Sequence, residues 1–211
     1  SLKRAIRFLS KPIRFGGLFP VEIVRLFSYG SGRVEDRLMD EHIVIDGNVG
    51  TLEGELIDEN LNSLSWWIDK HNRYSSLEAL ETYCETYFRS GQVRFSGATK
   101  KRRELKRIYQ VLPMTIRAVL LFLYRYVLRL GFLDGRIGFL FYFYQCLWYR
   151  LLVDTKVSLL LKRNLHQSCQ SLSEERVARI LGLSPELVTA KFERLRLDRK
   201  KQLAEDIKSH R

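Results

Sequence analysis

The feature that most limits how this chain folds is an apolar, aromatic stretch at residues 113–161. It holds 11 of the 25 aromatic residues (12 Phe, 3 Trp and 10 Tyr), and its longest uncharged run covers the thirteen residues 137–149. A helix that spans a bilayer needs about 20 apolar residues, so this run is too short to cross a membrane by itself. Arginines interrupt the stretch, among them Arg125, Arg129, Arg136 and Arg150.

Long basic side chains beside aromatic rings are typical of the boundary between lipid and water. The stretch therefore predicts two helices, over residues 114–130 and 136–162, that form an interfacial hairpin. The alternative interpretation is that both are ordinary core helices. The glycines near residues 131–135 allow a tight turn, and Asp134 is expected to cap the second helix.

The remaining sequence predicts an α+β fold that is mostly helical. Residues 22–29, 42–46 and 51–57 have the composition of short strands, and residues 33–37 are expected to pair back on the first of them. Ser63 is placed to cap a long helix over residues 64–89.

Three more helices are expected. A basic helix over residues 100–111 follows a loop at 91–99, and helices over 174–181 and 185–208 begin after Ser173 and Ser184. These boundaries suggest four segments: a strand-rich part at 1–62, amphipathic and basic helices at 63–112, the aromatic hairpin at 113–163 and a helical tail at 164–211.

The charge of the chain favours an anionic partner. Its 36 basic and 24 acidic residues give a net charge of +12, which suits a nucleic acid, an acidic membrane surface or a phosphorylated substrate. The charge is uneven, because residues 1–14 carry five basic residues and no acid, whereas residues 35–60 carry nine carboxylates and one arginine. Three widely separated cysteines form neither a metal-binding spacing nor a disulfide framework, which favours a reducing compartment.

The acidic segment contains the first candidate for catalysis. Neighbouring residues of a regular strand face opposite ways, so Asp40 and Glu41 cannot both face one substrate. One carboxylate at a strand end, among other negative charges, has the properties of a general base. A solvated acidic loop is the competing interpretation.

Other sequence motifs carry less chemistry. His71 is a lone helical histidine without a second histidine at i+4, so a zinc site is not expected. Glycine-rich phosphate loops and the GxSxG nucleophile motif are absent from the sequence. In the tail, Ala178, Gly182 and Val188 have the spacing of a helix-turn-helix. That spacing indicates two crossed helices, but residues 174–211 carry ten basic and seven acidic residues, a modest excess for a DNA-reading module.

Several short motifs then occur in order along residues 19–157. They are Phe19-Pro20, Arg25-Leu26-Phe27, Arg33, Asp36-Arg37, Asp40-Glu41-His42, Gly50, Gly54, Asp58, Asn60-Leu61, Trp67, Lys70-His71-Asn72-Arg73-Tyr74-Ser75, Glu78-Ala79, Tyr124-Arg125-Tyr126, Arg129-Leu130-Gly131-Phe132-Leu133-Asp134-Gly135, Gly138, Trp148-Tyr149-Arg150, Val153-Asp154 and Lys156. Together they resemble the C-terminal half of a bacterial family 2 glycosyltransferase, of the kind that builds lipopolysaccharide core, colanic-acid-type or other exopolysaccharide sugars.

This resemblance implies a two-part inverting transferase with a GT-A-type fold. Its N-terminal half binds the nucleotide sugar and holds Mg²⁺ or Mn²⁺ through an Asp-x-Asp motif, which this sequence does not contain. Its C-terminal half supplies the acceptor site and the catalytic base. The metal is therefore expected mainly through the first half.

The resemblance also assigns roles to six residues. The base maps to Asp40-Glu41, and Glu41 is favoured because related members often carry His-Glu there. Asp58 is assigned a metal or diphosphate contact. Arg25, Arg37 and His42 are expected to contact the donor phosphates, and the competing interpretation of the two arginines is that they are surface or strand-pairing residues.

The expected partners are a nucleotide sugar, a saccharide or lipid-linked acceptor and an anionic membrane surface, without a nucleic acid. The resemblance places the protein at the cytoplasmic face of the bacterial inner membrane, in a peripheral or re-entrant position. Two other classes stay open. One is a DNA-binding helix-turn-helix protein, and the other is a non-catalytic membrane-associated interaction module.

Overall fold

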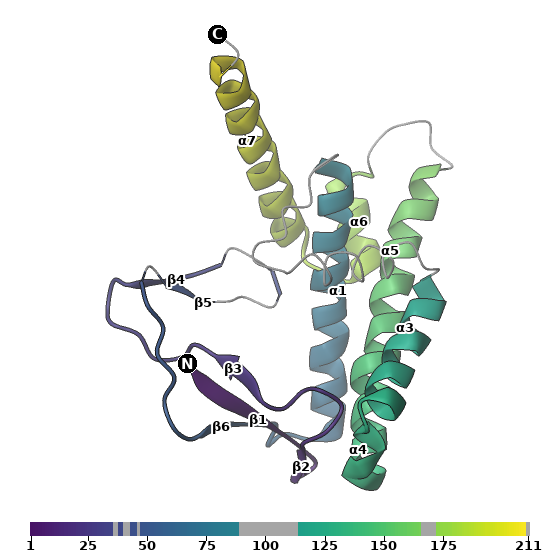
Figure 1. The fold of residues 1–211 in the computed structure, drawn as a ribbon. Helices are drawn as coiled ribbons and strands as arrows, with labels where there is room; N and C mark the ends of the chain where they lie inside the picture. Colours follow the sequence, from purple (N-terminus) through teal and green to yellow (C-terminus); the bar gives the residue numbers. More distant parts are fainter. Residues whose placement is uncertain (36–37, 40–42, 46, 89–113, 166–171, 210–211) are drawn as a thin grey trace. The chain divides into compact units, whose positions relative to one another are not determined.

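The computed structural model describes residues 1–35, 38–39, 43–45, 47–88, 114–165 and 172–209, and it is α+β with mostly helical residues, as predicted (Figure 1). Contacts divide the chain into two units. The first contains residues 1–73 and 112–152, and the second contains residues 74–111 and 153–211. The loop expected at 91–99 and the basic helix expected at 100–111 lie outside the described residues.

The first unit begins with a four-stranded mixed sheet centred on β1 (Leu2–Phe8). On one edge, β1 pairs antiparallel with β2 (Lys11–Ile13) and β3 (Val21–Ile23), and on the other it pairs parallel with β6 (Glu55–Glu59). Cross-strand pairs of opposite charge support the β1–β6 pairing, because the Arg7 guanidinium donates to Glu59 Oε2 at 3.3 Å.

The strand prediction for residues 22–29 is wrong for most of its length, because β3 ends at Ile23. In the antiparallel register Ile23 lies opposite Leu2, the first residue of β1, so the residues after Ile23 extend beyond the end of β1 and have no residue of that strand to pair with. The described residues of the segment 33–37 do not pair back on β3 either, and residues 36–37 lie outside the described part of the chain. Instead β4 (Gly32–Val34) pairs antiparallel with β5 (Ile43–Ile45) in a separate two-stranded sheet.

Two further strand assignments differ from the sequence prediction. The strand expected at 51–57 is β6, which begins at Glu55 and ends at Glu59. β1 and β2 were not predicted, because Lys3, Arg4 and Arg7 interrupt the apolar alternation that marks a strand. The structure shows that these basic side chains share β1 with the buried Phe8.

Helix α1 (Leu64–Phe88) confirms the long helix and its cap. The N–H of Trp66 donates to Ser63 Oγ at 3.2 Å, which satisfies one of the free amides at the start of the helix. Trp67, on the next position, is 7% exposed and packs edge-on against Phe8 and Tyr144. The first turns of α1 therefore contribute to the core of the first unit.

The expected hairpin is present, although it is not formed by two regular α-helices. Its first arm is α3 (Met114–Leu123), followed by the π-helical turn η1 (Tyr124–Leu128) and the 3-10 turn η2 (Gly131–Asp134). Its second arm is α4 (Gly135–Tyr142), the π-helical segment η3 (Phe143–Trp148) and α5 (Tyr149–Leu165). Among the described residues, no helix has the length and apolar character needed to cross a membrane.

The inner side of the hairpin completes the core of the first unit. The buried members of this core are Phe8, Ile13, Trp67, Phe141, Tyr142 and Cys146. They come from the sheet, from α1 and from the second arm of the hairpin, so three stretches far apart in the sequence share one apolar cluster.

The second unit holds the rest of α1 and α5 together with α6 (Glu174–Leu181) and α7 (Pro185–Ser209). The predicted starts of both tail helices are confirmed. Ser173 stands at the N-cap position of α6, but its side chain makes no capping hydrogen bond, and its carbonyl accepts the N–H of Arg176 at 3.0 Å instead. Gly182 ends α6 in the left-handed conformation with φ of 63°, a geometry that favours glycine.

Candidate functional site

Four of the six residues assigned to the site lie outside the described residues: Arg37, Asp40, Glu41 and His42. The strands on either side of them are described. β4 and β5 pair with Val34 opposite Ile43, so the segment 35–42 connects two neighbouring strand ends. This segment contains four carboxylates, Arg37 and His42.

The two described site residues are not brought together. Arg25 is exposed and follows β3, whose Ile23 is level with Leu2 of β1. Asp58 is on β6, level with Ile6 of β1, and its carboxylate lies 3.9 Å from the Arg4 guanidinium. The two levels, Leu2 and Ile6, are four residues apart on β1, which is about 13 Å along the strand. One ligand group therefore does not contact both side chains at these positions.

The most connected polar group of the first unit is centred on Asp134. Its Oδ1 accepts the N–H of Arg14 at 3.0 Å and its Oδ2 accepts the N–H of Phe15 at 3.2 Å. The Tyr142 hydroxyl lies 2.9 Å from the carbonyl oxygen of Phe15 and 3.2 Å from Asp134 Oδ2. We call this group, with the loop that it holds, the Asp134 junction. The predicted role of Asp134 as a side-chain cap of α4 is wrong, because its carboxylate binds the loop instead.

The loop of the Asp134 junction is held from a second side by the hairpin. The N–H of Gly16 donates to the carbonyl oxygen of Arg129 at 2.9 Å, and the Arg125 guanidinium donates to the carbonyl oxygen of Gly16 at 3.2 Å. A β-carbon at Gly16 would lie 2.3 Å from the Tyr142 hydroxyl oxygen. Glycine is required at this position because the backbone approaches the ring so closely.

The surroundings of Tyr142 in the Asp134 junction keep its hydroxyl group protonated. Burial raises the pKa of Tyr142 well above its usual value, and the neighbouring Asp134 carboxylate raises it further. The hydroxyl therefore stays protonated and available as a donor at any physiological pH. The arrangement holds a loop in place; it does not present an activated nucleophile.

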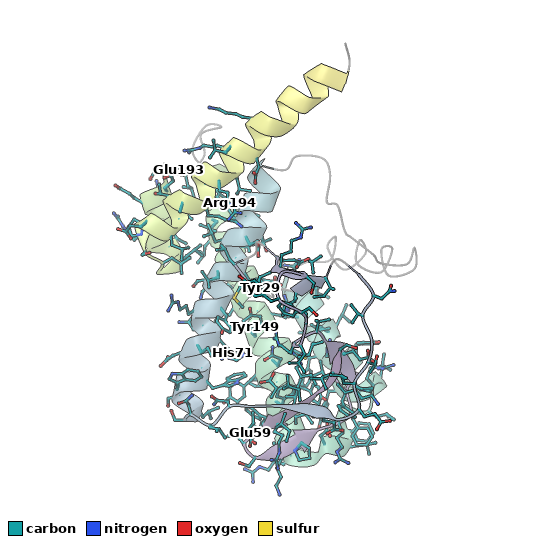
Figure 2. The ribbon with its side chains drawn as sticks, turned by 90° about the vertical axis from the view of Figure 1, so that its left-hand side faces the viewer. Tyr29, Glu59, His71, Tyr149, Glu193 and Arg194 are labelled. Carbon is teal, nitrogen blue, oxygen red and sulfur yellow. The ribbon has the colours of Figure 1, made fainter. Side chains whose placement is uncertain are left out.

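His71 has the structural role that its lone position indicated. Its ring stacks on Trp67 with centroids 3.6 Å apart and meets Tyr149 edge-on at 5.9 Å (Figure 2). Its Nδ1 lies 2.8 Å from the carbonyl oxygen of Trp67, and burial lowers its pKa below the usual value. No group of three or more potential metal ligands occurs among the described side chains.

In the second unit, Lys156 joins α5 to α1. Its ammonium donates to Ser75 Oγ at 2.7 Å and to Ser76 Oγ at 2.8 Å, and Ser76 Oγ donates to the carbonyl oxygen of Leu181 at 2.7 Å. A serine beside a lysine is also the geometry of an activated nucleophile. Ser75 is 0% exposed, so a substrate cannot reach its Oγ, and the contact is structural. Ser75 and Lys156 both belong to the ordered motifs of residues 19–157, but their spacing along the sequence did not indicate that their side chains are in contact.

The Lys156 contact predicts a specific pH dependence of stability. Burial lowers the pKa of Lys156 from 10.5 to about 8, so between these values the unfolded chain keeps a proton that the folded chain has released. Lys156 should therefore contribute a rise in the free energy of unfolding as the pH increases from about 8 to 10.5. Burial raises the pKa of Cys146 and of Tyr142, so these two groups contribute in the opposite direction in both proteins. Urea denaturation of the wild type and of Lys156→Met separates the contributions, because the free energy of unfolding of the wild type should gain on that of the variant over this pH range. An equal pH dependence in both proteins would contradict the prediction.

The helix corner predicted in the tail is present. Val177, Ala178 and Val188 are at most 2% exposed, and the N–H of Leu183 donates to the carbonyl oxygen of Ala178 at 3.0 Å. α7 also packs on α1, with Phe192 and Tyr83 ring centroids 6.4 Å apart. The small residues of the helix-turn-helix spacing are thus used for packing within this unit.

The exposed side of α7 carries charges of both signs. Glu193 and Arg194 are exposed neighbours on this helix, and Glu186 is exposed in its first turn (Figure 2). DNA binding relies on an excess of basic side chains toward the phosphates. The described part of α7 has no such one-signed surface, so the corner supports a packing role better than a DNA-reading role.

Comparison with known protein families, with curated proteins and with solved structures found no match to this chain.

Proposed function

We propose that this chain is the acceptor-side part of an inverting glycosyltransferase with a partial GT-A-type fold. The enzyme would transfer a sugar from a nucleotide-sugar donor to a saccharide or lipid-linked acceptor in cell-envelope polysaccharide synthesis. The observation that carries the proposal is the pairing of β4 with β5, which joins the two ends of the acidic segment 35–42. The type of reaction is inferred from the resemblance of the ordered motifs in residues 19–157 to a family 2 glycosyltransferase.

Glycosyl transfer with inversion needs a base beside the acceptor. Glu41, or Asp40 in its place, would take the proton from the acceptor hydroxyl as its oxygen attacks C1 of the donor sugar. The bond between C1 and the phosphate oxygen breaks at the same time, and a nucleoside diphosphate leaves. Such general base catalysis contributes about 10²–10⁴-fold to a rate.

The departing diphosphate needs positive charge. Mg²⁺ or Mn²⁺, held mainly by the nucleotide-binding half, would supply Lewis-acid stabilisation. Arg25, Arg37 and His42 are the residues of this chain proposed to contact the phosphates, with Asp58 as a further metal or diphosphate contact. Because Arg25 follows β3 and Asp58 is on β6, two strands that pair with opposite edges of β1, we propose that they serve different parts of the donor.

The test is sugar transfer by the full-length protein that contains this chain. The full-length protein is incubated with a panel of radiolabelled nucleotide sugars, and membrane extracts or purified lipid-linked acceptors supply the acceptor. Each reaction is run with Mg²⁺, with Mn²⁺ and with chelator. The proposal expects one donor to label the acceptor in a metal-dependent way. Failure of all donors, together with a sequence-selective, salt-dependent shift of duplex DNA by the protein, would favour the helix-turn-helix alternative.

A further inference from the structure

We propose that the tip of the helical hairpin inserts into the headgroup region of an anionic lipid bilayer. The hairpin tip is the chain reversal around η1 and η2, and its apolar side chains are between 44% and 73% exposed. These side chains are Leu123, Val127, Leu128, Leu130, Phe132 and Leu133. All of them belong to the first unit, within one short stretch of chain.

The hairpin is apolar on both of its sides. Its inner side is buried in the core, where Phe141 is 6% and Tyr142 is 0% exposed. A helix at the surface of a water-soluble domain normally has a polar outer side. Here the outer side continues the exposed apolar surface of the tip through Leu120 on α3 and Phe139 on α4, which are 44% and 41% exposed. A contiguous surface of this kind marks a site of contact with an apolar partner.

The charges around the hairpin tip identify that partner. Arg129 and Arg136 are exposed within the turn region, and Arg14 is held beside it because its N–H donates to Asp134 Oδ1. Exposed apolar side chains interspersed with arginines match a phospholipid surface, where the apolar side chains reach acyl carbons and the guanidinium groups reach phosphates. The net charge of +12 adds attraction to anionic lipid.

The contact is interfacial. No helix in the described ranges can span a bilayer, and the apolar residues of the tip are grouped at a turn, where they enter only the upper part of a leaflet. A tip bound in this way would hold the first unit at the surface that carries a lipid-linked acceptor. That consequence rests on the proposed function, whereas the membrane contact itself does not.

The experiment is flotation of the chain with phosphatidylcholine vesicles, with and without phosphatidylglycerol. The wild type should float with the anionic vesicles and bind neutral vesicles more weakly. Leu128→Glu/Leu133→Glu should lower the partition coefficient on anionic vesicles by about tenfold or more. Arg129→Gln/Arg136→Gln should lower binding to anionic vesicles and leave binding to neutral vesicles unchanged.

The matched control is Ile57→Glu/Leu61→Glu, which places two carboxylates on apolar side chains that are 59% and 89% exposed elsewhere in the first unit. This control should float like the wild type, and circular dichroism should show that all variants fold. Equal flotation of the tip variant and the control would overturn the proposal. So would a wild type that stays in solution as a dimer and becomes a monomer in the tip variant, because a second copy would then cover the tip. Flotation requires no sugar transfer, so membrane contact and the proposed reaction can fail separately.

Discussion

Glu41→Gln in the full-length protein should lower the rate of sugar transfer about 10²–10⁴-fold. Glutamine keeps the size and hydrogen-bonding reach of the side chain but cannot accept the proton of the acceptor hydroxyl. The loss should fall on kcat, because the missing proton transfer takes place in the transition state. Thermal unfolding should stay unchanged, since an acid-to-amide change keeps the size and shape of the side chain.

Two companion variants make the result specific. Asp40→Asn should lose much less activity than Glu41→Gln, because Glu41 is the favoured base. Glu193→Gln removes an exposed carboxylate on α7, outside the series of motifs, and should transfer at the wild-type rate. A wild-type rate in Glu41→Gln with a large loss in Asp40→Asn would identify Asp40 as the base. Wild-type rates in both would contradict an acidic base in this segment.

The helices were predictable because their signals are local. Ser63 before an amphipathic run gave the start of α1, and Pro185 after Ser184 gave the start of α7. The Gly-rich break gave the turn of the hairpin. Each signal depends on residues within one or two turns of helix, so tertiary contacts did not alter it.

The strands were less predictable because their pairing is not local. The sequence from Val24 to Tyr29 has the composition of a strand, but it follows Ile23, which lies opposite the first residue of β1, so it runs past the end of that strand. β1 itself was missed because its three basic residues look like a solvated segment. Register and partner choice decide such cases, and neither can be read from one strand alone.

The contacts between distant motif residues were also beyond the sequence. Asp134 has the position of a helix cap, yet it binds the amides of Arg14 and Phe15, which are about 120 positions away along the chain. Ser75 and Lys156 stood in the same motif series, yet only the pairing of α1 with α5 brings them to 2.7 Å. The turn of the hairpin was better predicted, because the glycines that mark it lie at the turn itself.

The second large expected effect is a loss of stability when the Asp134 junction is broken. Asp134→Ala should lower the free energy of unfolding by about 1–3 kcal/mol, because the variant leaves the amides of Arg14 and Phe15 without their charged acceptor. Asp134→Asn keeps one acceptor oxygen and should lose less. Asp69→Ala removes an exposed carboxylate on α1 and should stay within about 0.5 kcal/mol of the wild type.

A double-mutant cycle then tests whether Asp134 and Tyr142 act as one group. Tyr142→Phe removes only the hydroxyl, which lies 2.9 Å from the Phe15 carbonyl oxygen and 3.2 Å from Asp134 Oδ2. If both side chains hold the same loop, the losses in Asp134→Asn and Tyr142→Phe should not add, and the coupling should be about 0.5 kcal/mol or more. Urea denaturation followed by circular dichroism measures all four proteins. Strictly additive losses would mean that the two side chains stabilise the loop independently, and an Asp134→Ala variant as stable as Asp69→Ala would remove the junction as a determinant of the fold.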